Sequence, residues 1–379
     1  MQDVEGRSPG RPTIAEVSLQ ALRENCRQAA ALVPSGVAVL AVVKADAYGH
    51  GAVAAARAFL DGGAAGLGVS MAAEGRELRR AGIDAPIVVL GGAFPGEEAA
   101  VVGDDLVAAV WTLEGGRALA AAARAAGRTA AVHLKVNTGM TRLGCEVADV
   151  RALGEALAAE PHLRLDGVFS HFASAEAVDT ETARAQIVRF AGAVEDLATA
   201  GIRPRWVHLA NSAAVLTQPS AHFSMVRPGI MLYGYAPAPH LASRARLRPA
   251  MRLWTRIAQV RDVPAGTATG YGGTWVAPRP SRIATLPIGY ADGYHRAASN
   301  RGNMLVAGRR VPVAGRVCMD HVMLDVTEVP KPHAGDAVTV FGPDLGADEV
   351  AGWSDTIAYE VLTSVGMRVP RVYVEEFDA

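Results

Sequence analysis

The sequence has few of the features that mark secreted, membrane-bound or nucleic-acid-binding proteins. Its three cysteines are odd in number and far apart, so they fit neither a disulfide framework nor a zinc site and suit a reducing compartment. No apolar run is long enough to span a bilayer, and the N-terminus lacks the apolar stretch of a signal peptide. The 37 basic residues balance the 38 acidic ones, which disfavours nucleic acid and anionic membranes as partners. We therefore expect a soluble cytoplasmic protein.

The N-terminal part of the chain alternates short apolar runs with Ala-rich helical stretches. Eight apolar runs are candidate strands: residues 37–43, 66–70, 86–90, 106–111, 131–136, 163–170, 205–210 and 223–226. The helical stretches include residues 52–61, 71–81, 113–126 and 180–201. Such alternation indicates a parallel sheet covered by helices, and eight strands favour a (β/α)8 TIM barrel over an open doubly wound sheet. No GxGxxG follows the first strand, which weakens the dinucleotide-binding alternative.

After about residue 240 the pattern changes to short alternating runs bounded by Gly and Pro. The candidate strands there are residues 252–260, 282–288, 310–319, 321–326 and 337–341, with one helical piece near 353–365. A chain of 379 residues is longer than one core usually fills. We therefore predict two domains, a barrel over residues 1–240 and an all-β domain over residues 241–379.

Lys44 ends the first apolar run and begins the sequence KADAYGHG. Taken alone, such a lysine would more often extend from a strand end into water. An amine held at the end of a buried strand is also well placed to form a Schiff base with a carbonyl compound. The residues after the other strands decide between these two interpretations.

In an α/β barrel the catalytic residues gather at the carboxyl ends of the strands. The polar and glycine residues at those ends are Lys44, Asn137, Arg142, His171, Asn211, Ser212, Arg227 and Gly229, followed by Ile230. Individually, His171 would suit a core and Arg227 a surface. Together they predict a single site at one rim of the barrel.

The loops after the seventh and eighth strands commonly bind phosphate in such barrels. Here they offer the Ser212 hydroxyl and the backbone N–H groups of Gly229 and Ile230. A Schiff-base lysine opposite a phosphate site indicates pyridoxal 5'-phosphate, with Arg227 as partner of the pyridine nitrogen. An arginine remains protonated there and leaves the ring nitrogen largely unprotonated. That arrangement suits a reaction that moves one proton and does nothing else.

The motifs along the whole chain resemble the alanine racemase family, whose members are fold-type III pyridoxal-phosphate enzymes. The resemblance covers both predicted domains, and its motifs stand in the family's order: AVVKADAYGHG (41–51), VHLKVNTGMTRLG (132–144), HLANSAA (208–214), RPGIMLYG (227–234), GYGGTW (270–275), PIGYADGY (287–294) and GRVCMD (315–320). It implies interconversion of L-alanine and D-alanine, which supplies D-alanine for bacterial cell-wall peptidoglycan.

The resemblance also implies a role for particular residues. Lys44 would form the Schiff base and act as the base on one face of the substrate, and Tyr271 would be the opposite base, oriented by His171. Arg227, backed by His208, would face the pyridine nitrogen. The residues that would hold the phosphate are Tyr48, Ser212, Gly229, Ile230 and Tyr359. Arg142 and the backbone at Met319 would fix the substrate carboxylate.

Further implied features concern the partner subunit and the path of the substrate. Tyr271 and Met319 would come from a second copy of the chain, which makes the expected enzyme a head-to-tail homodimer with shared sites. Lys135 matches a lysine that is carbamylated in some relatives, and Asn137 stands where many have Asp. The residues expected to support the site or line its access path are Lys135, Tyr290, Arg296, Arg316, Asp320 and Ile357. No metal is expected.

Three alternatives remain open at this stage. A racemase of broader specificity, for serine or larger amino acids, would share these motifs. A decarboxylase of basic amino acids would need a cysteine and acidic substrate ligands in other motifs of its β domain, and these are not evident. A non-catalytic pyridoxal-phosphate carrier would end near residue 230 and lack GYGGTW and GRVCMD.

Overall fold

The computed structural model describes residues 11–378, and the chain divides into two compact units. The barrel unit comprises residues 22–47 and 52–247. Of the described residues, the β unit comprises 11–21, 48–51 and 248–378. The segment 11–21 therefore lies in the β unit, although the predicted boundary near residue 240 would assign it to the barrel.

All eight strands predicted for the barrel are present. They are β2 (Ala38–Val42), β3 (Gly66–Val69), β4 (Ile87–Val89), β5 (Val107–Val110), β6 (Ala130–Asn137), β8 (Leu163–Phe169), β9 (Trp206–His208) and β10 (Met225–Val226). Every pairing between them is parallel, in the order β5-β4-β3-β2-β10-β9-β8-β6. A further parallel pairing joins β5 to β6 and closes the ring. The predicted (β/α)8 barrel is confirmed.

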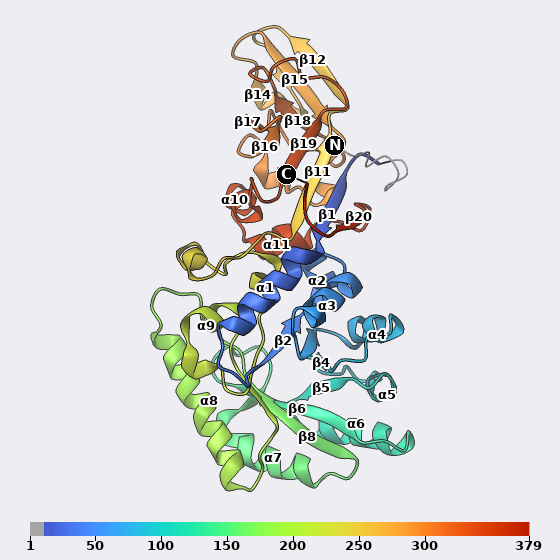
Figure 1. Cartoon of the computed structure of the whole chain (residues 1–379), viewed down its shortest axis with the longest axis vertical. Helices are drawn as coiled ribbons and strands as arrows, with labels where there is room; N and C mark the ends of the chain where they lie inside the picture. Colours follow the sequence, from blue (N-terminus) through green and yellow to red (C-terminus); the bar gives the residue numbers. More distant parts are fainter. Residues whose placement is uncertain (1–10, 379) are drawn as a thin grey trace. The chain divides into compact units, whose positions relative to one another are not determined.

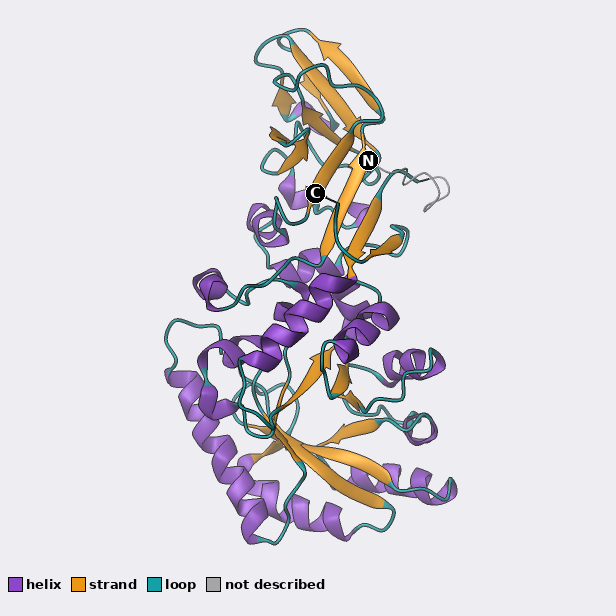
Figure 2. Cartoon of the chain, viewed as in Figure 1, coloured by secondary structure: helices purple, strands orange, loops and turns teal. Residues whose placement is uncertain are grey.

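Helices, which are labelled in Figure 1, cover the outside of this barrel, and Figure 2 shows them as purple ribbons around its orange strands. They are α1 (Leu19–Ala31), α3 (Ala52–Asp61), α4 (Ala72–Arg80), α5 (Glu98–Gly103), α6 (Leu113–Ala125), α7 (Val150–Ala159), α8 (Glu181–Thr199) and α9 (Ser212–Thr217). Every residue of β3 and of β4 is buried. Burial on both faces explains why these strands read as continuous apolar runs rather than as alternating patterns.

The described residues of the β unit form three sheets. The largest joins β17 (Arg309–Pro312), β16 (Asn303–Val306), β19 (Ala337–Phe341), β11 (Met251–Arg256), β1 (Ile14–Ser18) and β20 (Arg371–Val374) in that order. A second contains β12 (Gln259–Val263), β15 (Ser281–Leu286) and β18 (Val322–Asp325), and a third contains β13 (Ala268–Thr269) and β14 (Trp275–Val276). Buried and half-buried residues alternate along β11, as in a strand with one face on a core.

Three details of the β unit differ from the sequence-based predictions. The predicted strand 252–260 is two strands, β11 and β12, that belong to different sheets. The predicted strand 310–319 ends at Pro312, because a loop takes its remaining residues. The predicted helix near 353–365 is present only over α11 (Ala358–Thr363), and a separate helix, α10 (Ala347–Trp353), precedes it. Asp355 between them has φ +53°, a left-handed conformation that a continuing right-handed helix cannot contain.

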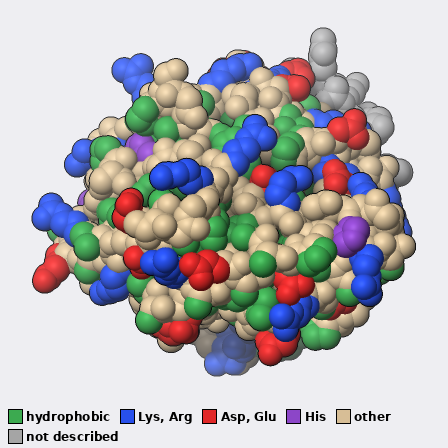
Figure 3. Space-filling model, turned by 90° about the horizontal axis from the view of Figure 1, so that it is seen from below, with side chains coloured by type: hydrophobic (Ala, Val, Ile, Leu, Met, Phe, Trp, Pro, Cys, Tyr) green, Lys and Arg blue, Asp and Glu red, His purple; other side chains and the backbone are tan. Residues whose placement is uncertain are grey.

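The surface agrees with the balanced composition. On the face drawn in Figure 3, basic and acidic side chains are interspersed with apolar ones. Within residues 11–378, no helix combines the length and the apolar composition that crossing a bilayer requires.

Candidate active site

Lys44 begins a turn of unusual backbone geometry. β2 ends at Val42, and the segment Lys44–Gly49 (α2) follows as one helical turn. Residues 45–48 have φ between +51° and +53°, so this turn is left-handed. Left-handed helical backbone costs roughly 1–2 kcal/mol for each non-glycine residue. Strain of this kind is typical of functional sites, where the surrounding structure fixes it in place.

Glu74 of α4 holds the start of this turn, although the sequence analysis did not identify it. Its Oε1 accepts a hydrogen bond from the amide of Ala45 at 2.7 Å, while Oε2 accepts from the two amides that precede α4 at 2.7 and 3.1 Å. Burial and the neighbouring Arg142 lower the pKa of Lys44, and Glu74 acts in the opposite direction. The lowered pKa increases the fraction of neutral amine, the form that can act as a nucleophile or base.

Arg227, directly after β10, is a buried cation that donates to several acceptors. Its side chain donates to the carbonyls of Ser170 at 2.6 Å and Leu209 at 3.2 Å, to Nδ1 of His208 at 2.9 Å and to Nδ1 of His171 at 3.3 Å. No carboxylate of the described residues forms an ion pair with it. Burial lowers the pKa of Arg227 to about 9, so it remains charged near neutral pH.

A chain of hydrogen bonds extends from Arg227 into the barrel. Nε2 of His208 lies 2.8 Å from Nδ1 of His133 on β6. Burial lowers the pKa of His208 well below its ordinary value and that of His133 to about 4, so both rings are neutral near pH 7. A guanidinium can only donate, and a neutral imidazole carries one N–H. His208 therefore accepts from Arg227 and donates to His133, which leaves the hydrogen of His133 on its Nε2.

The residues predicted to bind phosphate within the barrel unit lie together. Oγ of Ser212 accepts hydrogen bonds from the amides of Gly229 at 2.8 Å and Met231 at 3.4 Å. Its hydroxyl hydrogen therefore remains available to donate to an anion. Ile230 begins the 3-10 helix η4 (Ile230–Tyr233), where the first amides have no partner inside the helix.

A small pocket brings together four other predicted residues of the barrel rim. Its lining includes Lys135, Asn137, Arg142 and His171. Burial and then Arg227 lower the pKa of His171 well below its ordinary value, so this ring is neutral at physiological pH. The barrel unit therefore places Lys135, Arg142 and a neutral His171 around one space.

Asn137 organises the loop that carries Arg142. Its Oδ1 accepts from the amides of Gly139 at 3.1 Å and Thr141 at 2.9 Å, while its Nδ2 donates to Oε1 of Glu146 at 2.9 Å. An aspartate at this position would place a second carboxylate against Glu146. The amide side chain therefore suits this chain, although many relatives were expected to have Asp here.

Gln186 on α8 supports the same rim, and nothing in the sequence motifs pointed to it. It is fully buried, and its Nε2 donates to the Thr138 hydroxyl at 3.1 Å and to the carbonyl of His171 at 3.0 Å. Its Oε1 accepts from the amide of Ala173 at 2.9 Å. A single helix residue thus fixes the loops after both β6 and β8.

Lys135 provides a pH-dependent prediction. Burial, with Arg227, Arg142 and Lys44 nearby, lowers its pKa to about 8. Its neutral amine can add to carbon dioxide: a nitrogen–carbon bond forms, the nitrogen loses a proton, and a carbamate results. Because the neutral fraction increases as the pH rises through about 8, we expect more carbamate at pH 9 than at pH 7. Carbon-13 NMR with labelled bicarbonate measures the amount of carbamate. A carbamate signal that is unchanged in Lys135→Arg would contradict carbamylation of Lys135.

Within the β unit, the two tyrosines predicted to bind phosphate contact each other. The rings of Tyr48 and Tyr359 have centroids 5.9 Å apart and are tilted by 46°. Burial raises the pKa of Tyr48 to about 12, so its hydroxyl keeps its proton and can donate to an anion. Tyr359 lies on α11.

The apolar residues assigned to the partner's site or to the access path are exposed in the single chain. The exposed fractions are 70% for Tyr271, 53% for Met319, 41% for Tyr290 and 61% for Ile357. Tyr271 begins the 3-10 turn η6 (Tyr271–Gly273), whose Gly272 has φ +72°. Exposed large apolar side chains of this kind are typical of a surface that contacts another protein.

The loops that carry these residues contact one another through backbone hydrogen bonds and close packing. The amides of Tyr290 and Ala291 donate to the carbonyls of Cys318 and Met319, each at 3.0 Å. Gly270 packs closely against the loop of Arg316: a Cβ atom added to Gly270 would lie 3.4 Å from the amide nitrogen of Arg316. The GYGGTW, GYADGY and GRVCMD segments therefore form one cluster of loops in the β unit.

Asp320 takes part in an ion-pair network that supports this cluster. Arg368 donates to Asp320 at 2.6 Å and to the fully buried Asp292 at 2.7 Å, and Arg11 pairs with Asp292 as well. The other oxygen of Asp292 accepts from the amide of Gly289 at 2.8 Å. Arg296 begins the 3-10 turn η8 (Arg296–Ala298), and Arg296 and Arg316 remain predictions as access-path residues.

Two family models match the chain, and together they cover nearly all of it. The alanine racemase N-terminal domain matches residues 17–237, and the alanine racemase C-terminal domain matches residues 250–373. The chain belongs to the alanine racemase family. A relative named alanine racemase from Geobacter sulfurreducens is 45% identical over 372 residues, which cover 96% of this chain and 97% of the relative. Another from Desulfovibrio desulfuricans is 44% identical, with 96% and 99% covered.

Solved structures of the alanine racemase family agree with this assignment. The enzyme of Streptomyces lavendulae has a TM-score of 0.92 and 40% identity, with 98% of this chain and 99% of that chain covered. The biosynthetic alanine racemase of Pseudomonas aeruginosa has a TM-score of 0.87 at 40% identity, with 96% and 100% covered. The resemblance inferred from the motifs is confirmed, and a single-barrel carrier would lack the matched C-terminal domain.

Proposed function

We propose that this chain is a racemase that interconverts L-alanine and D-alanine with pyridoxal 5'-phosphate as its cofactor. The observation that carries the proposal is Lys44, an amine of lowered pKa that follows a barrel strand on a strained turn. The same barrel contains Arg227, a buried cation without a carboxylate partner among the described residues. Membership of the alanine racemase family supports the choice of substrate.

The residues present fit this cofactor. Ser212 has a hydroxyl hydrogen to donate, and Gly229 and Ile230 supply backbone close to it, so these three would hold the phosphate. Arg227 would face the pyridine nitrogen, with His208 behind it. We assign Tyr48 and Tyr359 to the phosphate as well.

Pyridoxal 5'-phosphate, when bound, would join the Lys44 amine through its aldehyde and withdraw electrons from the α-carbon of the substrate. Arg227 donates to two carbonyls and two imidazoles, and this network holds the guanidinium in one place. A fixed cation stabilises negative charge that develops near it without reorganising. Lys44, with a lowered pKa, would take or return the α-proton on its own face.

Inversion of the stereocentre requires a second base on the opposite face, because one base would return its proton to the side from which it came. We assign this role to Tyr271, supplied by a second copy of the chain. The exposure of Tyr271 and Met319 supports the head-to-tail dimer, since both side chains are presented outward. Arg142 and the backbone at Met319 would bind the substrate carboxylate.

The test is a panel of amino acids offered to the holoenzyme, with chiral chromatography of each product. Alanine should racemise fastest, with serine and lysine slower, and no carbon dioxide should be released. Equal rates for alanine and serine would favour the broader racemase. Release of carbon dioxide from lysine or another basic amino acid would favour the decarboxylase. D-alanine from this reaction would be the form used in bacterial peptidoglycan.

A further inference from the structure

A second cavity lies at the amino end of the barrel strands, opposite the rim that carries Lys44. Its volume is about 330 Å³, within the range of roughly 300–1,000 Å³ that small-molecule sites occupy. All eight barrel strands or the residues just before them contribute to its lining. Barrels of this kind are usually filled by packed side chains, so an open space at this end is a departure from the common pattern.

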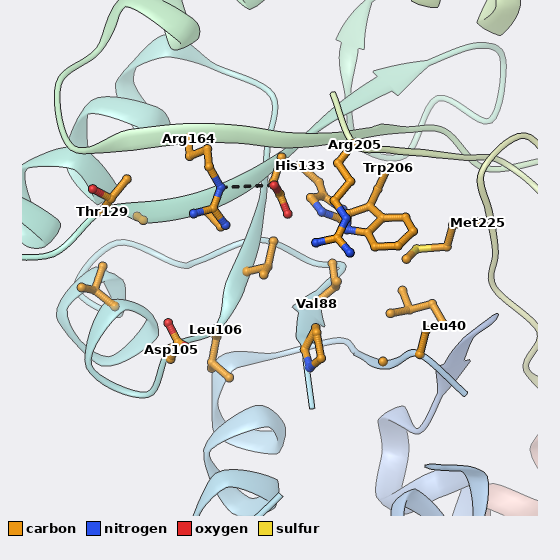
Figure 4. A pocket seen from close by; sticks show the side chains of 18 of the residues that line it. Leu40, Val88, Asp105, Leu106, Thr129, His133, Arg164, Arg205, Trp206 and Met225 are labelled. Atoms are coloured by element: carbon orange, nitrogen blue, oxygen red, sulfur yellow. Dashed lines mark hydrogen bonds and ion pairs between the residues drawn. The ribbon is translucent and has the colours of Figure 1, made fainter. Parts of the chain in front are cut away.

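The cavity has an apolar wall. Leu40, Val88 and Met225 form a buried cluster against which Trp206 packs. Figure 4 shows these side chains on one side of the space, with the Trp206 ring next to Met225 and above Leu40. Such a wall suits a compact apolar group of a ligand.

Two arginines lie beside the apolar wall, Arg164 on β8 and Arg205 just before the neighbouring strand β9. The guanidinium of Arg205, just before β9, lies over the Trp206 ring, 4.5 Å from its centroid. No acidic side chain of the described residues pairs with Arg205. Arg164 uses its Nε for Asp166 at 3.1 Å, the dashed contact in Figure 4, which leaves its two terminal nitrogens outside that pair. A guanidinium beside an aromatic ring can still donate its N–H groups to a carboxylate.

His133 of β6 lies beside the cavity, where the backbone of β8 leaves room for its ring. Val132 pairs with Leu165 and His133 pairs with Gly167, so the register skips Asp166 as a bulge. A Cβ atom at Gly167 would come within 2.6 Å of the His133 ring, so a side chain there would displace the imidazole. His133 lines the cavity, and its Nε2 carries the ring hydrogen because its Nδ1 accepts from His208. This adds a third donor to the wall that contains Arg164 and Arg205.

On the β8–β9 side Asp166 offsets one of the two arginines, and the other acidic residues of the lining lie elsewhere or are paired. Asp105 pairs with Arg128 at 3.3 Å, and Asp84 precedes β4, which is separated from β9 by three strands in the ring. The guanidinium of Arg79 donates to four backbone carbonyls, so its hydrogen bonds stabilise the fold. The donors and the apolar wall therefore meet on the β8–β9 side.

We propose that this cavity binds a small organic monocarboxylate, with its carboxylate at Arg205 and Arg164 and its apolar body against Trp206, Leu40 and Met225. The site is distinct from the candidate active site because it lies at the other end of the same strands. His133 is a wall of the cavity and also the last member of the hydrogen-bonded chain that begins at Arg227.

The test uses 4-fluorobenzoate as the probe and fluorine NMR of the holoenzyme as the readout. We expect saturable binding of 4-fluorobenzoate and at least tenfold weaker binding of the neutral 4-fluorobenzamide. Arg205→Gln should weaken benzoate binding about tenfold or more, since a charge-assisted contact is lost. Arg203→Gln, an exposed arginine two residues earlier, is the matched control and should change it less than about twofold.

Three results would overturn the proposal: no saturable binding, equal binding of acid and amide, or benzoate binding that Arg205→Gln leaves unchanged. The last result would place the probe at another site, such as Arg142 on the opposite rim. Arg164→Gln and Trp206→Leu provide independent variants, each expected to weaken binding, should Arg205→Gln fold poorly. Racemisation of alanine, measured separately, tests the proposed function and does not depend on these outcomes.

Discussion

Lys44→Ala should abolish racemisation and the yellow colour of the bound cofactor together. The variant removes both the amine that would join the cofactor and the base on one face of the substrate. Loss of a positioned base alone typically lowers a rate by about 10²–10⁴-fold, and loss of the covalent link should add to that. Chiral chromatography of alanine and the visible absorption spectrum measure the two effects on one sample. Retained turnover would contradict the role of Lys44.

The control for this variant is another lysine of the chain. Lys331 is exposed and has φ +45°, a conformation that asparagine tolerates well. Lys331→Asn should keep both the colour and the activity of the wild type. A second check is thermal unfolding. Because the left-handed φ values belong to Ala45–Tyr48 and not to Lys44, Lys44→Ala should still fold.

Tyr271→Phe should keep the cofactor, and its rate of racemisation should fall by about 10²–10⁴-fold. The side chain is 70% exposed in the single chain, so removal of its hydroxyl should change the free energy of unfolding by no more than about 0.5 kcal/mol. Lys44 would still serve one face of the substrate. One enantiomer of alanine should therefore continue to exchange its α-hydrogen with solvent while the other does not.

Proton NMR in deuterium oxide, with each enantiomer supplied separately, measures this asymmetry. Tyr373→Phe on β20 is a suitable control, because this tyrosine is 42% exposed and has no proposed part in the reaction. Loss of exchange from both enantiomers, or full racemisation by Tyr271→Phe, would contradict the assignment of two opposed bases.

The barrel and its rim could be predicted because each rests on short-range sequence patterns. Strands such as β3 and β4 are buried on both faces, so their apolar character is continuous and their ends are easily placed. Lys44, Ser212 and Arg227 each come within four residues of the end of a barrel strand (β2, β9 and β10). The carboxyl ends of all barrel strands lie at the same rim, so the positions of the strands in the sequence are enough to predict that these residues lie there together.

The features that were missed depend on contacts between distant segments or on backbone conformation. Glu74 contacts Ala45 of the Lys44 turn from 29 residues further along the chain. The residue types in KADAYG do not predict a left-handed turn. His133 looked like an ordinary strand residue, since its partner His208 lies 75 residues away. The N-terminal strand β1 was missed because its partners β11 and β20 come from the far end of the sequence.

Deuterium labelling tests the proposal that this chain racemises alanine through two bases on opposite faces. The most direct measurement incubates the wild-type holoenzyme with L-alanine in deuterium oxide and separates the enantiomers at early times for mass spectrometry. We expect D-alanine that carries deuterium at its α-carbon, beside remaining L-alanine that keeps its original hydrogen. Absence of D-alanine, or D-alanine that retains the original hydrogen, would contradict it.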